Sequence, residues 1–184
     1  MDDLRTARYL GPMAKWFERW VEKERERRDA RQFTASGRLQ RAQANLEPGV
    51  LTAEGFLGHD TRRLGALIRE DEAAFRDLGL DWDEVAVWLE HLVEAGAAGL
   101  GEPITVGRWL VRVAETRGTF PCPWEDGLFR KRSVTVRSVG PDGQAQGPEL
   151  LFSDLSLHLL KDHHFLQGRG SLFRLEPQVL KDLR

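Results

Sequence analysis

The 184-residue sequence has a single cysteine, Cys122, so it cannot form an internal disulfide bond. It also has no uninterrupted apolar run of about 20 residues, the length that a membrane-spanning helix requires. The first residues, 1–4, are acidic and lack the basic end and apolar stretch of a secretory signal peptide. From these absences we expect a protein of the reducing cytoplasm with no membrane segment.

The sequence contains no catalytic or nucleic-acid-binding motif of high specificity. Its hydrophobic content of 41% and charged content of 30% are typical of a globular protein rather than a disordered one. The charge is arranged in blocks, with an acidic stretch at 47–103 between two basic stretches. Nucleic-acid binding favours a sustained basic face, so nucleic acid is the less favoured partner.

The first half of the chain has the periodicity of helices. Helices are predicted over about 3–30 and 38–46, followed by one capped by Asp60 and ended by Gly79, and one capped by Asp81. The last of these carries acidic residues and no Lys or Arg, so it is unsuited to reading DNA. The first has large apolar side chains on one face, which favours self-association or docking of a protein partner: Met13, Trp16, Phe17, Trp20 and Val21.

The second half of the chain changes to an alternating pattern. Strands are predicted over 109–114, 133–137 and 149–152, with a tight turn at 140–143. Ser153 is expected to cap a further helix and Pro177 to begin a short terminal one. The predicted class is therefore α+β. We divide the chain into a helical extension (1–50), a helical pair (51–102) and a finger-like β-hairpin/helix module (103–184).

A candidate zinc site lies in this module. Cys122 stands in a proline-flanked turn, and His158 and His163 fall on the helix that follows the strands. Zinc binds thiolate, imidazole and carboxylate ligands in a tetrahedron, and Asp126 supplies the fourth ligand, with Glu125 or His164 as substitutes. Four protein ligands would make the zinc structural rather than catalytic.

The helix geometry sets one condition on this site. On an ideal α-helix His158 and His163 point about 140° apart, so we expect a distorted last turn. In the alternative interpretation no metal binds. Cys122 is then a small buried hydrophobe, His158 a hydrogen-bonded core residue, and His163 and His164 stabilise the helix end by their charge.

Three stretches of the chain are similar to a known group of proteins. They are Gly55-Phe56-Leu57-Gly58, the turn Pro121-Cys122-Pro123-Trp124, and the tail from His158 to Arg174 that contains His163, Phe165, Gly168, Gly170 and Ser171. With these, residues 55–175 resemble a family of small uncharacterised bacterial proteins. The resemblance implies no activity, but it implies that the hairpin-helix tail is a unit. His164 departs from it by standing where a helix-ending glycine is expected.

Two basic features have alternative interpretations. Arg169 and Arg174, beside Gly168 and Gly170, form either a weak anion-binding turn or part of an ordinary stop after a helix. The run 130–132 is either solvated or touches nucleic-acid phosphates.

The predicted function is a non-enzymatic binding or assembly protein with structural zinc. The alternatives are a finger-like nucleic-acid-binding regulator and a metal-dependent hydrolase.

Overall fold

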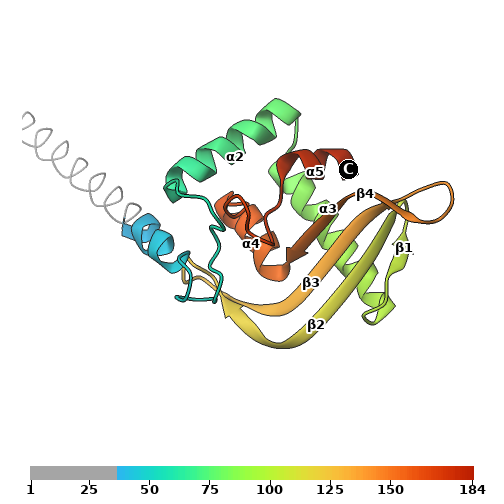
Figure 1. Ribbon diagram of the computed structural model, residues 1–184, viewed down its shortest axis with the longest axis horizontal. Helices are drawn as coiled ribbons and strands as arrows, with labels where there is room; N and C mark the ends of the chain where they lie inside the picture. Colours follow the sequence, from blue (N-terminus) through green and yellow to red (C-terminus); the bar gives the residue numbers. More distant parts are fainter. Residues whose placement is uncertain (1–36) are drawn as a thin grey trace, which may run out of the picture. The chain divides into compact units, whose positions relative to one another are not determined.

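A computed structural model describes residues 37–184 (Figure 1). The helix predicted over 3–30 lies outside the described residues. A helix covers 37–45, as the sequence predicts, and residues 41–184 form one compact unit. Within the described chain, helices occupy the first half and strands dominate the second, so the α+β prediction is confirmed.

The two central helices are α2 (Leu64–Leu78) and α3 (Trp82–Gly96). Gly79 ends α2 in the left-handed conformation, and the Asp81 carboxylate caps α3 by accepting from the Glu84 N–H at 2.9 Å, both as predicted. The prediction that Asp60 caps α2 is wrong. The N-cap residue of this helix is Arg63, three residues after Asp60, and it makes no side-chain cap. The Leu64 N–H donates to Gln43 Oε1 at 2.6 Å, and the Asp60 carboxylate accepts from Arg62.

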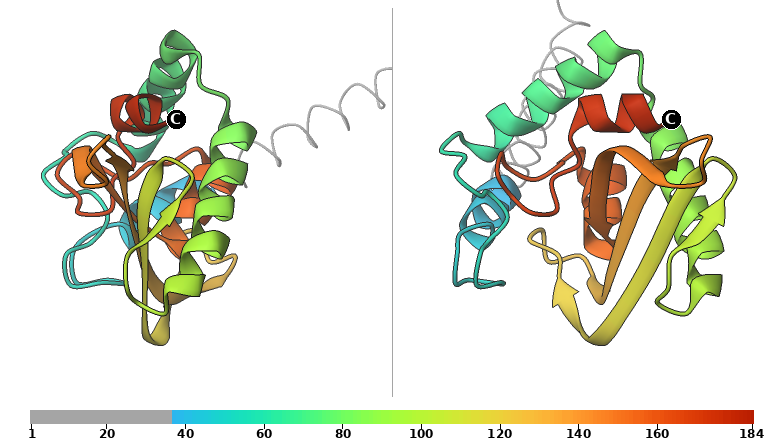
Figure 2. Two further views of the ribbon diagram at one scale, coloured as in Figure 1. Left: turned by 90° about the vertical axis from the view of Figure 1, so that its right-hand side faces the viewer. Right: turned by 45° about the vertical axis from the view of Figure 1, so that its right-hand side comes forward.

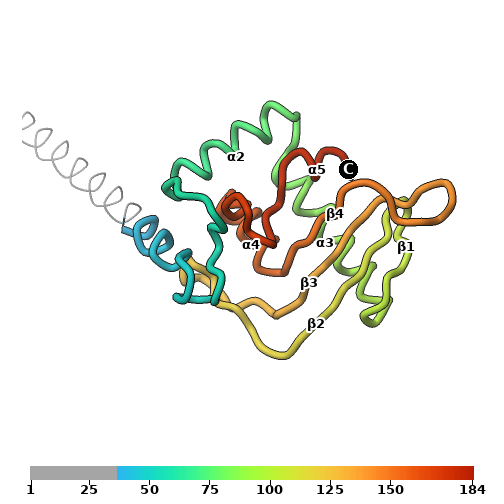
Figure 3. Tube along the Cα trace, viewed as in Figure 1, coloured from blue at the N-terminus to red at the C-terminus, as the bar shows by residue number. Residues whose placement is uncertain are grey.

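The sheet is a four-stranded antiparallel meander in the order β1-β2-β3-β4. Its strands are β1 (Ile104–Val106), β2 (Trp109–Pro121), β3 (Leu128–Val139) and β4 (Ala145–Ser153). The three predicted strands are present, but β2 and β3 extend beyond their alternating segments to form one long hairpin, and β1 was not predicted. The Cα trace in Figure 3 follows this hairpin out to the turn between β2 and β3.

The main core lies between α3, the inner face of the sheet and the two last helices, α4 (Asp154–His163) and α5 (Pro177–Leu183). Figure 2 shows α3 running alongside the strands. Ser153 caps α4 through a capping box with Ser156, and Pro177 begins α5, as predicted. Among the helices of residues 37–184, none has the length and apolar character needed to cross a membrane.

A second apolar cluster joins parts of the chain that are distant in sequence. It contains Cys122 from the hairpin turn, Leu155 and Leu159 from α4, and side chains of α2 and of residues 42–57. All three named side chains are buried. This cluster brings the tip of the β2–β3 hairpin against the end of α4, where the predicted metal ligands lie.

Candidate metal centre

The turn between β2 and β3 places Cys122 and Asp126 in one tight loop. The Cys122 N–H donates to the Gly127 carbonyl and the Glu125 N–H donates to the Cys122 carbonyl, each at 2.9 Å. Glu125 has a φ of 63°, which reverses the chain between the two candidate ligands. The Trp124 N–H points at the Cys122 sulfur at 3.4 Å. The backbone therefore holds the thiol in the loop interior.

The end of α4 supplies the two histidines. The helix continues through His163, and its end is looser than a regular α-helical turn. The N–H groups of His164 and Phe165 both donate to the Leu159 carbonyl, five and six residues earlier, instead of four. This widening agrees with the distorted last turn that we expected. The chain changes direction only afterwards, at His164, which has a φ of 49°. This is the left-handed conformation that glycine adopts most easily, which agrees with the expectation of a helix-ending glycine there.

The structure brings all four predicted ligands together. One donor atom from each of Cys122, Asp126, His158 and His163 lies within 4.8 Å of the other three. The Cys122 Sγ is 3.6 Å from His163 Nε2. The Asp126 carboxylate lies between the rings, 3.1 Å from His158 Nε2 and 2.9 Å from His163 Nε2. The group could hold a metal ion.

These distances can be compared with the edges of a metal tetrahedron. With Zn–S of about 2.3 Å and Zn–N of about 2.05 Å, a tetrahedral site has an S···N edge of about 3.6 Å and an N···O edge of about 3.4 Å. The observed S···N distance of 3.6 Å equals the first value. The two N···O distances, 3.1 and 2.9 Å, are a few tenths shorter than the second, and they join different oxygens of Asp126, Oδ1 to His158 and Oδ2 to His163. The carboxylate and the imidazoles would therefore have to shift before one Asp126 oxygen and both nitrogens could bind a single ion.

Burial and charge determine the protonation of the group. Burial, together with the nearby Asp126 carboxylate, raises the pKa of the Cys122 thiol to about 12. Burial would raise the pKa of Asp126, but hydrogen bonds from Cys122 and His158 and the neighbouring imidazoles lower it overall. Burial lowers the pKa of His163 against the opposing charge of Asp126. A thiol this weakly acidic becomes a thiolate when a cation displaces its proton.

Aromatic rings hold the imidazoles in place. The Trp124 ring stacks on His163 with centroids 4.1 Å apart and planes 5° from parallel, and Phe129 stacks on His158 at 4.2 Å. The His158 and His163 side chains are only 13% and 12% exposed, whereas that of Asp126 is 42% exposed. The site is therefore walled by protein on the histidine side and reaches solvent at the carboxylate.

The two substitute ligands lie elsewhere. Glu125 turns toward Asn45, whose side-chain N–H donates to its carboxylate at 3.3 Å and to the Pro123 carbonyl at 2.8 Å. His164 pairs with Glu72 at 3.0 Å and stacks on Trp82 at 4.3 Å. Sequence reasoning missed the Asn45 contact, because Asn45 is 78 positions away from Pro123 and carries no local signal of its partner.

The group does not have the geometry of a cysteine-histidine nucleophile. In such a pair the base receives the thiol proton on one ring nitrogen and is oriented by a carboxylate at the other. Here Cys122 and Asp126 both face Nε2 of His163. The raised pKa of Cys122 also opposes thiolate formation, whereas catalytic thiols have lowered values. The four donor atoms lie within 4.8 Å of one another and could hold a cation.

The predicted anion-binding arginines bind carboxylates of the chain itself. The Arg174 side chain is 7% exposed and pairs with Asp71 at 2.7 Å and with Glu176 at 2.8 Å. Arg169 pairs with Glu70 at 2.6 Å. Because each guanidinium already has an internal carboxylate partner, the two do not form a common anion site.

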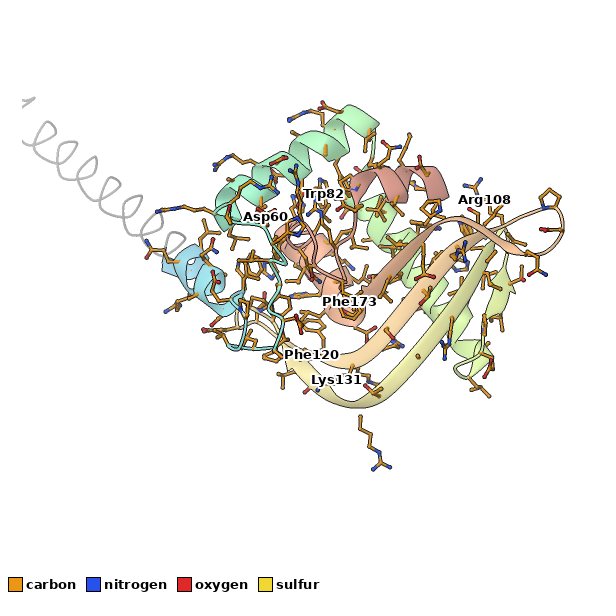
Figure 4. All side chains as sticks on the ribbon, viewed as in Figure 1. Asp60, Trp82, Arg108, Phe120, Lys131 and Phe173 are labelled. Atoms are coloured by element: carbon orange, nitrogen blue, oxygen red, sulfur yellow. The ribbon has the colours of Figure 1, made fainter. Side chains whose placement is uncertain are left out.

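The basic run 130–132 is also engaged within the chain. Arg130 pairs with Glu115 at 3.6 Å and Arg132 with Asp154 at 2.7 Å. Figure 4 labels Lys131 and Phe120 on the neighbouring strands, where the ammonium lies 4.6 Å from the ring centroid. These contacts leave no clustered free basic run for nucleic-acid phosphates at this position.

No protein-family model matches the chain, and searches of curated proteins and of solved structures returned no match. The resemblance of residues 55–175 to small bacterial proteins therefore stays a prediction.

Proposed function

We propose that the chain binds one zinc ion through Cys122 Sγ, an Asp126 carboxylate oxygen, and the Nε2 atoms of His158 and His163. The observation that carries the proposal is the convergence of these four donor atoms within 4.8 Å of one another. The ion would be structural, in a non-enzymatic protein that binds a protein partner or assembles with itself.

The donor set selects the metal. Thiolate and imidazole ligands suit zinc, whereas magnesium and calcium take oxygen ligands almost exclusively. A thiolate from Cys122 and a carboxylate from Asp126 carry two negative charges, which a divalent ion neutralises. A nearly neutral cluster is what a largely buried position tolerates, because an uncompensated buried charge is costly.

A structural role follows from where the ligands come from. Cys122 and Asp126 belong to the tip of the β2–β3 hairpin, and His158 and His163 belong to α4. An ion held by all four joins two segments of the fold, as structural zinc does. A metal-dependent hydrolase instead keeps one coordination position for water, which a complete set of four protein ligands removes.

The test is metal analysis of the purified full chain. We expect one equivalent of zinc in the wild type, and less than a tenth of this in Cys122→Ser and His158→Ala after dialysis. His91→Ala is the matched control, because His91 is exposed on α3 and lies outside the group. A wild-type chain that takes up no metal from zinc-containing buffer, with full stability, would contradict the proposal.

Cobalt substitution separates structural zinc from the hydrolase. Co²⁺ at the proposed site should give a thiolate-to-metal charge-transfer band and the intense visible bands of a tetrahedral ion. Both should be unaffected by small anions that compete for a water position. The bands should disappear in Cys122→Ser. Anion-dependent spectra would instead indicate an open coordination position and favour the hydrolase.

A further inference from the structure

The second ring nitrogen of His158 has a partner outside the four ligands. His158 Nδ1 lies 2.7 Å from the Asp162 carboxylate, one helical turn further along α4. The same ring directs Nε2 into the donor group, 3.1 Å from Asp126. His158 therefore lies between two carboxylates, one at each nitrogen.

We infer that Asp162 is a positioning residue for the metal centre: it accepts a hydrogen bond from Nδ1–H of His158 and presents Nε2 to the ion. This inference rests on the proposed function. A metal-binding histidine must offer a lone pair on the ligating nitrogen, so its single proton must sit on the other one. A carboxylate at Nδ1 secures that tautomer, sets the ring orientation and raises the basicity of the ligand.

The position of Asp162 on the helix supports a role beyond stability. Asp162 is in the last turn of α4, where a negative charge is unfavourable because the carbonyl end of a helix is itself negative. Its side chain is 53% exposed, so water partly screens its contact with His158 and the contact contributes little to folding. Helix stability therefore does not explain a carboxylate at this place, whereas the bond to His158 does.

The two histidine ligands are then held in different ways. His163 stacks on Trp124, with centroids 4.1 Å apart and planes within 5° of parallel. His158 is held by Phe129 on its face and by Asp162 at its edge. Of the two rings, His158 is the one with a carboxylate, that of Asp162, at Nδ1, where it can hold the ring proton.

The experiment compares wild type with Asp162→Asn, which keeps the shape and removes the charge. We expect zinc affinity, measured by competition with a chromophoric chelator, to fall about 10- to 100-fold. Asp182→Asn is the matched control, because Asp182 is also an exposed acceptor four residues after its donor, Gln178, near the end of a helix. The control should leave zinc affinity unchanged.

Two further measurements separate positioning from a purely structural role. The melting temperature of the metal-free chain should change by no more than about 2 to 4 °C, since the Asp162 side chain is half-exposed and its pairing with His158 is partly screened by water. Long-range ¹⁵N–¹H spectra of the zinc-loaded wild type should show the His158 proton on Nδ1. A proton on Nε2, or an unchanged affinity in Asp162→Asn, would overturn the inference.

The outcomes also distinguish this inference from the proposed function. If wild type and Asp162→Asn bind zinc equally well, only the role of Asp162 is refuted. If the wild type binds no zinc, the metal centre itself is refuted. A large loss of metal-free stability in Asp162→Asn would show that the residue serves folding and would also overturn the inference.

Discussion

Individual side chains in this protein take their chemistry from their neighbours, and Cys122 is the clearest case. In a metal-free chain its thiol is buried beside a carboxylate, and its pKa of about 12 keeps it protonated at neutral pH. The same position beside a divalent ion yields a thiolate ligand. A cysteine taken by itself could be either a small buried apolar residue or a metal ligand. The neighbouring Asp126, His158 and His163 are what favour the metal ligand.

The charge of the Asp60 carboxylate is expected to stabilise the fold. The hydrogen bond from Arg62, opposed by burial and aided by the Arg169 N–H, holds the pKa of Asp60 far below its usual value. A lowered folded-state pKa stabilises the fold above the unfolded value of about 3.9, and this contribution is lost as the pH falls toward the folded value. We expect Asp60→Asn to cost about 1 to 3 kcal/mol at pH 7.

The measurement is urea unfolding of wild type and Asp60→Asn at pH 7, 5, 4 and 3. The difference in unfolding free energy should be constant between pH 7 and 5 and should shrink below about pH 4. Asp142→Asn serves as the control, because this aspartate is exposed in the turn between β3 and β4. A difference that stays constant down to pH 3 would show that the charge of Asp60 is not responsible.

Among the elements, the packing of two glycine-containing loops can be tested directly. Gly168 follows α4, and its N–H donates to the Phe56 carbonyl at 2.9 Å. A Cβ at this position would lie 2.2 Å from the Leu57 carbonyl oxygen, which is backbone and cannot rotate away. We expect Gly168→Ala to lower the unfolding free energy by about 2 to 4 kcal/mol, because the loops must separate.

Thermal or urea unfolding measures this cost. Gly37→Ala is the control, since Gly37 lies in a helical segment and a Cβ there would meet nothing within 4 Å among residues 37–184. It should leave stability unchanged or raise it slightly. Equal stabilities of the two variants would contradict the close packing of these loops.

The elements also show where sequence reasoning succeeded and failed. The helix N-caps Asp81 and Ser153 were predicted correctly, because each side chain accepts a hydrogen bond from a backbone N–H only three residues further along the chain. Asp60 was misassigned because an arginine two residues away competes for its carboxylate. The outer parts of β2 and β3 were missed because they carry polar residues on exposed positions and are held by backbone pairing, which leaves no apolar alternation.

For the whole molecule, zinc should act as a ligand that binds the folded state alone. At a free concentration 100 times the dissociation constant, such a ligand adds about 2.7 kcal/mol to the unfolding free energy. For a chain of this size the melting temperature should rise by about 5 to 10 °C. Differential scanning calorimetry with and without a chelator measures this rise.

In His163→Ala the melting temperature should no longer depend on zinc, whereas in His91→Ala it should still rise when zinc is present. A melting temperature of the wild type that does not respond to chelation would contradict a structural ion. Three of the four candidate ligands, Cys122, His158 and His163, could be selected from the sequence because Cys and His are rare in it and occur on both sides of one predicted hairpin. Asp126 was selected only because it lies four residues after Cys122. The surrounding Asn45 and the stacked rings depend on tertiary packing, which local patterns do not encode.

The spacing of the ligands along the chain has a consequence for the order of events during folding. Cys122 and His163 are 41 positions apart, and β3, β4 and nearly all of α4 lie between them. A refolding chain can unite the donors only after β3, β4 and α4 have formed and packed, and pairing of strands that are distant in sequence is slower than local helix formation. The ion would then arrive after the rate-limiting step, so that it slows unfolding while leaving the refolding rate nearly unchanged.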